Sequence, residues 1–356
     1  MRYRQLGRSG LKVSALSFGT MTFGGRGDFA YAGNTGVDGA RRQVELCLEA
    51  GVNLFDTADA YSGGRSEEIL GEAIRGHRDE LLLATKCGMD VGPSLNDRGL
   101  SRHHIIRSCE GSLRRLGVDH IDLYQVHAWD GQTPLEETLA ALDDLVKAGK
   151  VRYTGCSNYS SWHLMKALGI SEREGLTRFD SQQIYYSLQA REAEYELVPA
   201  SVAEGLGILV WSPLAGGLLS GKYRRGTDPP AGSRHLTEWS EPPVRDPGQL
   251  YDTADVLVAI AEELETTAAA VALAWLLLKP AVTSLVIGAR TDEQLIANLA
   301  AADLELSEDQ MARLDAVSAP ALIYPYWHQR QTVFARLSPA DLTLLAAEPP
   351  RPHGLA

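Results

Sequence analysis

IDLYQVHAWD, residues 121–130, is an almost continuous apolar run that ends in a histidine followed by more polar residues. The segments NLFDTADAYSGG (53–64) and LLLATKCG (81–88) show the same pattern, with Asp56 and Lys86 at the ends of their apolar runs. A short apolar run bounded by polar residues is typical of a strand buried on both faces, as in a parallel sheet. Each run therefore predicts a buried strand with a polar side chain at its carboxyl end.

Eight strand candidates of this kind alternate with amphipathic helical windows, which include residues 41–50, 66–75, 102–116, 135–148 and 293–301. The strands are ALSFG near Leu16, NLF before Asp56, LLLAT before Lys86, IDLYQV before His127, VRYTGCS before Asn158, SQQIYY around Gln183, GILVW ending at Trp211 and TSLVIG ending at Gly288. Eight strand-and-helix units predict an α/β protein, a (β/α)8 TIM barrel, rather than an open doubly wound sheet.

The predicted barrel occupies residues 1–318 as a single domain and begins with a β-hairpin that turns at residues 7–10. A length of 356 residues suits one barrel of ~250 residues enlarged by insertions. The glycine-rich stretch 24–36 and the proline-rich stretch 226–247 predict large loops at the carboxyl end of the strands, the second being either a lid or disordered. The tail 319–356 is expected to contribute to a substrate loop, unless its end is simply mobile.

Composition argues against several classes of partner. A formal net charge of -12 disfavours binding to nucleic acid or to anionic membranes, but it leaves room for a local basic pocket. The longest apolar stretch, 268–278, is too short to span a bilayer, and the first residues contain no signal-peptide core. The four cysteines are isolated, which indicates reduced thiols and a cytoplasmic protein. No heptad pattern decides the oligomeric state, so a homo-oligomer stays open.

Four residues after three of these strands together make a general acid: Asp56, Tyr61, Lys86 and His127. A free phenol has a pKa of ~10 and donates its proton slowly at neutral pH. The ammonium of Lys86 would lower the pKa of Tyr61, while Asp56 would keep Lys86 charged and His127 would bind a substrate oxygen. Taken singly, Asp56 is more often a turn residue or helix cap, and His127 a core histidine or half of a metal site.

The ordered motifs FDTADAYSGGRSEEILG, ATKCG, DLYQVHAWD, GKVRYTGCSNY, WSPLAGGLLSGKY and IGARTDEQLIANLAA resemble the aldo-keto reductase superfamily over roughly residues 2–318. The resemblance implies reduction of aldehydes or ketones, sugars or xenobiotics among them, with a nicotinamide cofactor and without a metal. It places the carboxamide group of the nicotinamide at Ser157, Asn158 and Gln183, and the nicotinamide ring on Trp211. The full cofactor set would be Gly19, Thr20, Met21, Asp56, Ser157, Asn158, Gln183, Trp211, Ser212, Pro213, Leu214, Gly216, Lys222, Gly288, Ala289, Arg290, Gln294 and Asn298.

The cofactor is predicted to be NADPH, because Arg290 precedes a helix amino terminus and a guanidinium binds phosphate in a forked geometry. Gln294 and Asn298 match the positions that contact the adenosine half, although Ala297 stands where the family commonly has an acid. Around the carbonyl of a small-molecule substrate, the predicted contacts are Tyr61, His127 and an apolar wall of Met21, Phe23, Trp129, Tyr324, Tyr326 and Trp327. The alternative explanation of these aromatics is ordinary packing.

Two other functions stay open. One is a cofactor-sensing binding protein, since WSPLAGGLLSGKY also resembles potassium-channel β subunits; those proteins lack the histidine found here, so His127 argues for turnover. The other is metal-dependent hydrolysis with Asp56, Asp59 and His127 as ligands. The chain has no HxH or comparable cluster, and Lys86 beside such a site would repel a cation.

Overall fold

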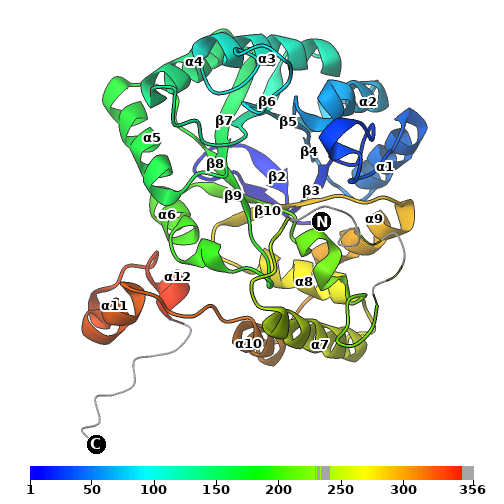
Figure 1. The fold of residues 1–356 in the computed structure, drawn as a ribbon, viewed down its shortest axis with the longest axis vertical. Helices are drawn as coiled ribbons and strands as arrows, with labels where there is room; N and C mark the ends of the chain where they lie inside the picture. Colours follow the sequence, from blue (N-terminus) through cyan, green and yellow to red (C-terminus); the bar gives the residue numbers. More distant parts are fainter. Residues whose placement is uncertain (229, 231–232, 234–240, 347–356) are drawn as a thin grey trace, which may run out of the picture.

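The computed structural model describes residues 1–228, 230, 233 and 241–346. Eight parallel strands close into a barrel in the order β10-β3-β4-β5-β6-β7-β8-β9, with helices around it (Figure 1). The barrel strands are β3 (Leu16–Gly19), β4 (Leu54–Asp56), β5 (Leu82–Cys87), β6 (Ile121–Val126), β7 (Val151–Ser157), β8 (Ser181–Tyr185), β9 (Gly207–Trp211) and β10 (Val282–Ile287). The predicted TIM barrel, with all eight of its strands, is confirmed.

The helices of the outer layer are α1 (Val37–Glu49), α2 (Arg65–Ala73), α3 (Arg102–Leu116), α4 (Leu135–Lys147), α5 (Ser161–Glu174), α6 (Leu197–Glu204), α7 (Pro247–Glu263), α8 (Ala268–Leu277), α9 (Asp292–Leu299) and α10 (Glu308–Val317). Helix α3 has the predicted bounds, whereas α1 begins four residues earlier than the predicted window. None of the helices that the structure describes is long and apolar enough to cross a bilayer.

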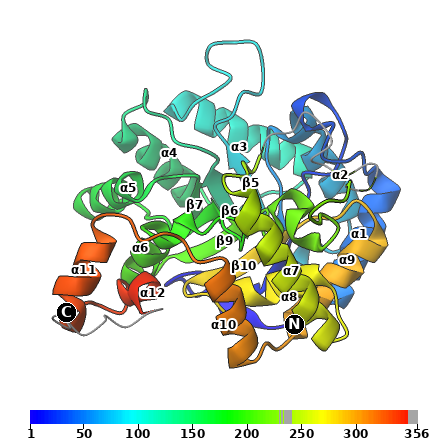
Figure 2. The ribbon, with the colours of Figure 1, turned by 60° about the horizontal axis from the view of Figure 1, so that its bottom comes forward.

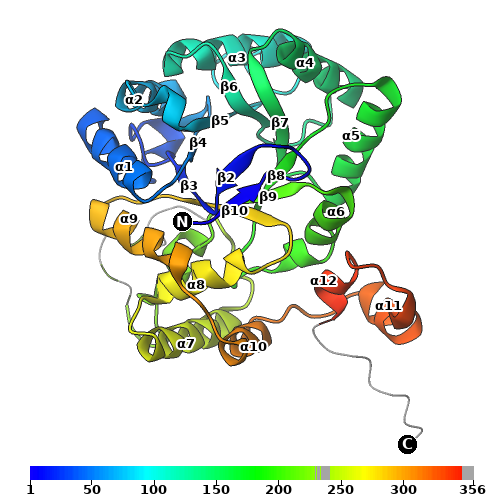
Figure 3. The same cartoon turned by 180° about the vertical axis from the view of Figure 1, so that it is seen from behind.

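The amino-terminal hairpin, β1 (Tyr3–Gln5) and β2 (Lys12–Ser14), is antiparallel as predicted and lies across one end of the barrel (Figure 3). Its turn is closely fitted, because a Cβ on Gly7, where φ is +60°, would come within 2.5 Å of the carbonyl oxygen of Asp180. Leu6 and Val13 are fully buried and join the apolar cluster inside the barrel, so the hairpin seals this end.

Strand alternation explains why the other end carries polar side chains. The inner cluster contains Leu54, Ala84 and Leu123, one from each of three neighbouring strands. Because side chains two residues apart share a face of a strand, Asp56 and Lys86 follow Leu54 and Ala84 on the inward face. The apolar half of each strand therefore packs the barrel, and the next inward position supplies the site.

Several loops lie at this polar end. Residues 88–101, between β5 and α3, extend furthest from the barrel (Figure 2). In the stretch 226–247, predicted to be either a lid or disordered, residues 229, 231–232 and 234–240 lie outside the described part of the chain. The same holds for residues 347–356 of the tail. The described tail forms α11 (Tyr326–Thr332) and α12 (Leu342–Leu345), which lie beside α6 and away from the barrel mouth (Figures 1 and 2).

Candidate active site

A buried carboxylate stands at the centre of the site. Asp56, the last residue of β4, is 2% exposed, and its carboxylate forms a short ion pair with the Nζ of the fully buried Lys86. Lys86 also donates to the carbonyl oxygen of Thr57 at 2.8 Å. The other carboxylate oxygen accepts from Gln183 Nε2 at 2.8 Å and from Gln125 Nε2 at 3.2 Å. Three donors therefore hold Asp56 in one place, which fixes the ammonium of Lys86.

Tyr61 opens the 3-10 helix Tyr61–Gly64 and hydrogen-bonds this ammonium: Lys86 Nζ lies 3.3 Å from Tyr61 Oη. Burial opposes the charge of Lys86, but Asp56 and Tyr61 outweigh it and raise the pKa of the ammonium, which stays charged. The expected lowering of the Tyr61 pKa is wrong. Burial raises the pKa of the phenol, Lys86 offsets this only in part, and Asp56 raises the pKa further.

His127 follows β6 and meets the Tyr61 ring edge-on, with centroids 5.7 Å apart and planes at 78°. Burial, assisted by the charge of Lys86, lowers the pKa of His127 to about 3. The imidazole is therefore neutral at pH 7 and presents an N–H donor, while Tyr61 keeps its proton. Among the described residues, no three His, Cys, Asp or Glu side chains come together in a way that could hold a metal ion.

Asp56, Tyr61 and His127 line a cleft of about 1370 Å³, larger than the ~300–1,000 Å³ pockets of drug-sized ligands, and Lys86 lies buried behind them. Of the predicted cofactor residues, all but Thr20 line it: Gly19, Met21, Asp56, Ser157, Asn158, Gln183, Trp211, Ser212, Pro213, Leu214, Gly216, Lys222, Gly288, Ala289, Arg290, Gln294 and Asn298. The prediction that Thr20 contacts the cofactor is corrected, because its side chain is fully buried and hydrogen-bonds Ser66 Oγ at 2.8 Å behind the cleft wall.

At one side of the cleft, amide groups form a connected surface. Asn158, with φ of +57°, donates from Nδ2 to Ser157 Oγ and to the carbonyl oxygen of His127, both at 3.0 Å. The indole Nε1 of Trp211 donates to Asn158 Oδ1 at 2.9 Å. This arrangement couples Trp211 and Asn158 to the His127 backbone.

Arg290 lies at the far end of the cleft and reaches across to the loop after β3. Its Nε donates to the carbonyl oxygen of Ala32 at 3.0 Å, and one terminal nitrogen donates to that of Tyr31 at 2.6 Å. Its own amide donates to Gln294 Oε1 at 3.1 Å. The guanidinium therefore has carbonyl partners in this structure, which any phosphate at this end would share or replace.

Comparison with known proteins agrees with this geometry. The profile of the Aldo/keto reductase family matches residues 15–319. This chain belongs to that family. The family is one of oxidoreductases, and its members typically use nicotinamide cofactors.

Relatives of this aldo/keto reductase include differently named proteins. The "Uncharacterized oxidoreductase YrpG" of Bacillus subtilis is 39% identical over 328 residues, which cover 89% of this chain and 96% of the relative. The "Probable voltage-gated potassium channel subunit beta" of Arabidopsis thaliana is 37% identical over 310 residues, covering 85% and 92%. The "Putative voltage-gated potassium channel subunit beta" of Schizosaccharomyces pombe is 34% identical over 331 residues, covering 88% and 92%.

The predicted apolar substrate wall needs correction in this aldo/keto reductase. Met21 lines the cleft, but Phe23 is fully buried in the core, where its ring meets Phe18 at 5.8 Å. Trp129 does not line the cleft either, because its ring stacks on His163 at 3.8 Å and 8°.

The three tail aromatics are also outside the cleft. Tyr326 stacks on Tyr195 with ring centroids 5.5 Å apart, and its hydroxyl forms a short hydrogen bond with Glu196. Tyr324 and Trp327 are 72% and 43% exposed, beside one another on the same tail. The physical reason is that packing against the segment before α6 holds the tail to the side of the barrel.

Other residues form the apolar wall of the cleft near Tyr61. Phe29, in the loop after β3, meets the Tyr61 ring at 5.1 Å, and Met89 lines the same space from the loop after β5. No sequence signal marked these loop positions. Gln125 was also missed, although its position two residues before His127 places it on the same inward face, and that spacing could have identified it.

Proposed function

We propose that this protein is an NADPH-dependent reductase of aldehyde or ketone carbonyls, with Tyr61 as the general acid. The observation that carries the proposal is the hydrogen bond between Tyr61 Oη, which lines the cleft, and the buried ammonium of Lys86, 3.3 Å away. A reduced nicotinamide supplies a hydride when bound, so the protein must supply the matching proton. Tyr61 is protonated and stands beside a fixed positive charge that stabilises the phenolate left after proton transfer.

The other residues have distinct tasks in the proposed reaction. Neutral His127 donates an N–H to the carbonyl oxygen and orients it toward Tyr61. Asp56 keeps the ammonium in place but does not meet the substrate oxygen. Ser157, Asn158 and Gln183 offer the amide and hydroxyl groups that a carboxamide needs, and Trp211 presents an aromatic face beside them. These donors and acceptors fit a nicotinamide.

The test is NADPH consumption with 4-nitrobenzaldehyde by the wild type and by Tyr61→Phe. We expect kcat to fall about 10²- to 10⁴-fold in Tyr61→Phe with NADPH affinity kept, because only the proton donor is removed. Tyr124→Phe removes another buried hydroxyl, on β6, two strands along the barrel from β4, and is the matched control. Equal activity of Tyr61→Phe and the wild type would contradict the assignment of the acid.

Preference for NADPH over NADH is assigned to Arg290. Removing a charge-assisted hydrogen-bond donor costs about 1.5–3 kcal/mol, so Arg290→Gln should weaken NADPH binding roughly 10- to 100-fold. Because the same substitution releases Tyr31 and Ala32, the affinity for NADH, measured in parallel by fluorescence, reports that separate effect. Equal weakening of both cofactors would remove Arg290 from phosphate recognition.

A second candidate function is cofactor sensing without turnover, and the similarity to proteins named as potassium-channel β subunits favours it. His127 beside Tyr61 argues for turnover. Tight NADPH binding with no oxidation across a broad panel of carbonyls would favour the sensor.

A further inference from the structure

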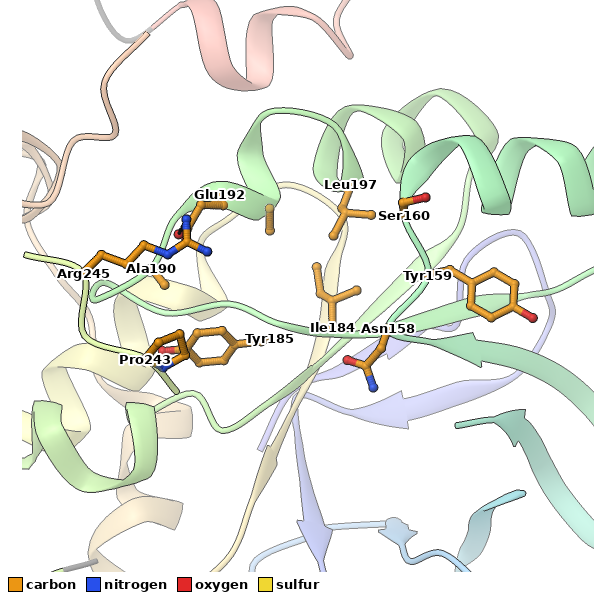
Figure 4. A pocket seen from close by; sticks show the side chains of 11 residues that line it. Asn158, Tyr159, Ser160, Ile184, Tyr185, Ala190, Glu192, Leu197, Pro243 and Arg245 are labelled. Atoms are coloured by element: carbon orange, nitrogen blue, oxygen red, sulfur yellow. Dashed lines mark ion pairs between the residues drawn. The ribbon is translucent and has the colours of Figure 1, made fainter. Parts of the chain in front are cut away.

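The cleft has walls of two kinds. On the side of β8, Tyr185 and Pro243 line the cleft and also line a smaller cavity of about 400 Å³ (Figure 4). Side chains fix this wall: Tyr185 Oη donates to Gln189 Oε1 at 2.6 Å, and Gln189 Nε2 donates to the carbonyl oxygen of Pro243 at 3.1 Å. The loop after β3, residues 20–36, forms another wall, and its support is of a different kind.

The loop after β3 is long and rich in glycine, with Gly24, Gly25, Gly27, Gly33 and Gly36 along it. Connections longer than about 12–15 residues are uncommon unless they have a function, and glycine adds backbone freedom that is lost on folding. The base of the loop is closed, because the amide of Gly24 donates to the carbonyl oxygen of Thr35 at 3.1 Å. We name residues 25–34, beyond this base, the arm. Such a segment needs attachments to the rest of the protein to keep one position.

Arg290, in the segment between β10 and α9, attaches the far end of the arm. Its Nε donates to the carbonyl oxygen of Ala32 at 3.0 Å, and a terminal nitrogen donates to that of Tyr31 at 2.6 Å. A planar guanidinium that bonds two adjacent carbonyl oxygens fixes the orientation of the arm as well as its distance. The near end of the arm is attached separately, because the amide of Arg26 donates to Ser62 Oγ at 3.3 Å.

Phe29 connects this attachment to the proposed proton donor. The amide of Ala32 donates to the carbonyl oxygen of Phe29 at 3.0 Å, so the residue that Arg290 holds in turn holds Phe29. The Phe29 ring meets the Tyr61 ring edge-on, with centroids 5.1 Å apart and planes at 61°, and both residues line the cleft. A continuous chain of contacts therefore runs from Arg290 at one end of the cleft to Tyr61.

We propose that Arg290 is a positioning residue for the carbonyl substrate: it fixes the arm, and the arm holds Phe29 against Tyr61 as a specificity-determining side chain. The inference rests on the proposed function and gives Arg290 a second role, separate from phosphate recognition. A ring attached to a carbonyl whose oxygen lies at Tyr61 is within reach of Phe29, whereas a short aliphatic aldehyde has no ring to place there. Selection of aryl over small aliphatic carbonyl compounds should therefore depend on Arg290.

The first measurement uses the protein without cofactor. Hydrogen exchange of peptides within residues 24–36 is followed by mass spectrometry in the wild type, Arg290→Gln and Arg42→Gln. We expect several-fold faster exchange in Arg290→Gln, because the amides of the arm open locally once its far end is released. Arg42→Gln is the matched control, since Arg42 on α1 pairs with Asp292, two residues after Arg290, at 3.2 Å without lining the cleft. It should leave the exchange unchanged.

The second measurement is kcat/KM for 4-nitrobenzaldehyde divided by that for propanal, at NADPH concentrations that saturate each variant. The propanal value corrects for any effect on the cofactor itself. Phe29→Ala should lower the ratio about two- to tenfold, and Arg290→Gln should lower it by a smaller factor. The double variant should equal Phe29→Ala alone, because Arg290 acts on the aldehyde through Phe29. Arg42→Gln should leave the ratio as in the wild type.

The outcomes separate the two proposals. The positioning role is wrong, while the reductase stands, if exchange or the aldehyde ratio in Arg290→Gln equals that of the wild type. It is equally wrong if the ratio in the double variant falls by the product of the two single factors, because Arg290 and Phe29 would then act independently. If NADPH binds and neither aldehyde is reduced, the proposed function fails and the inference fails with it.

Discussion

Two buried carboxyl groups lie three residues apart, Asp56 at the end of β4 and Asp59 in the loop that follows, and their surroundings are opposite. Asp56 accepts from Lys86, Gln125 and Gln183, whereas Asp59 has only weak contacts with the Ser108 side chain and the Ala60 amide and no close donor among the described residues. Burial, reinforced by Glu67 and only partly opposed by Arg115, raises the pKa of Asp59 to about 8.

The difference shows how one short loop produces both a charge and a neutral acid. Asp56 faces the barrel axis, where side chains of neighbouring strands converge on it. Asp59 continues alongside β5, with its amide donating to the carbonyl oxygen of Lys86 at 3.1 Å, and its side chain turns away from those donors. The charge of a buried carboxyl is thus decided by its donors rather than by its depth.

The largest effect is expected from Asp56→Asn. This substitution leaves the ammonium of Lys86 buried without its counter-charge, which should lower the free energy of unfolding at pH 7 by about 3–5 kcal/mol. Urea denaturation measures the change. Asp59→Asn makes the same atomic exchange three residues away and should cause no such loss, so equal losses would contradict the comparison.

Asp59→Asn should change how stability depends on pH. The folded-state pKa of Asp59, about 8, exceeds the unfolded value of ~3.9, so the wild type loses stability as pH rises between these values. In unfolding experiments at pH 5, 6 and 7, the stability of Asp59→Asn relative to wild type should increase by about 1.4 kcal/mol per pH unit. A constant difference would mean that Asp59 is ionised in the folded protein.

His127 should change the pH dependence of stability in the opposite direction to Asp59, and over a narrower pH range. Its folded pKa, about 3, lies below the unfolded value of ~6.5, so the unfolded chain binds the extra proton and the contribution of His127 to stability falls as pH drops below 6.5. The stability of His127→Asn relative to wild type should therefore increase by about 1.4 kcal/mol per pH unit as pH falls from 6.5 to 4, and should stay constant above pH 7. A difference that stays constant below pH 6.5 as well, followed by circular dichroism in urea, would show that the imidazole is not buried as a neutral group.

The smallest effect is expected from Gln125→Leu. It removes one donor from Asp56, at 3.2 Å, and also an amide oxygen that has no hydrogen-bond partner among the described residues, so the loss should be about 1 kcal/mol. Gln183→Leu is the contrasting variant, because Gln183 lines the cleft and its loss should also weaken NADPH binding. A loss in Gln125→Leu as large as in Asp56→Asn would make the glutamine, rather than Lys86, the main support of the carboxylate.

The sequence by itself determined the barrel and the convergence of the proposed catalytic residues. Buried parallel strands read as continuous apolar runs, and each must end at the same rim, so Asp56, Lys86 and His127 converge whatever the loops do. The sequence predicts their proposed roles because those roles depend on residue type at a strand end, and the predicted cofactor positions, all but Thr20, line the cleft at the same rim.

Only the tertiary structure decided where the aromatic side chains lie and which acidic side chains keep their protons. Phe23 and Trp129 find closer partners in the core and on His163 than in the cleft, and the tail is held beside α6 by Tyr195. No local pattern encodes such contacts, because they join segments far apart in the chain. The raised pKa of Tyr61 has the same origin: desolvation depends on everything packed around a side chain, and sequence spacing reveals only its nearest charge.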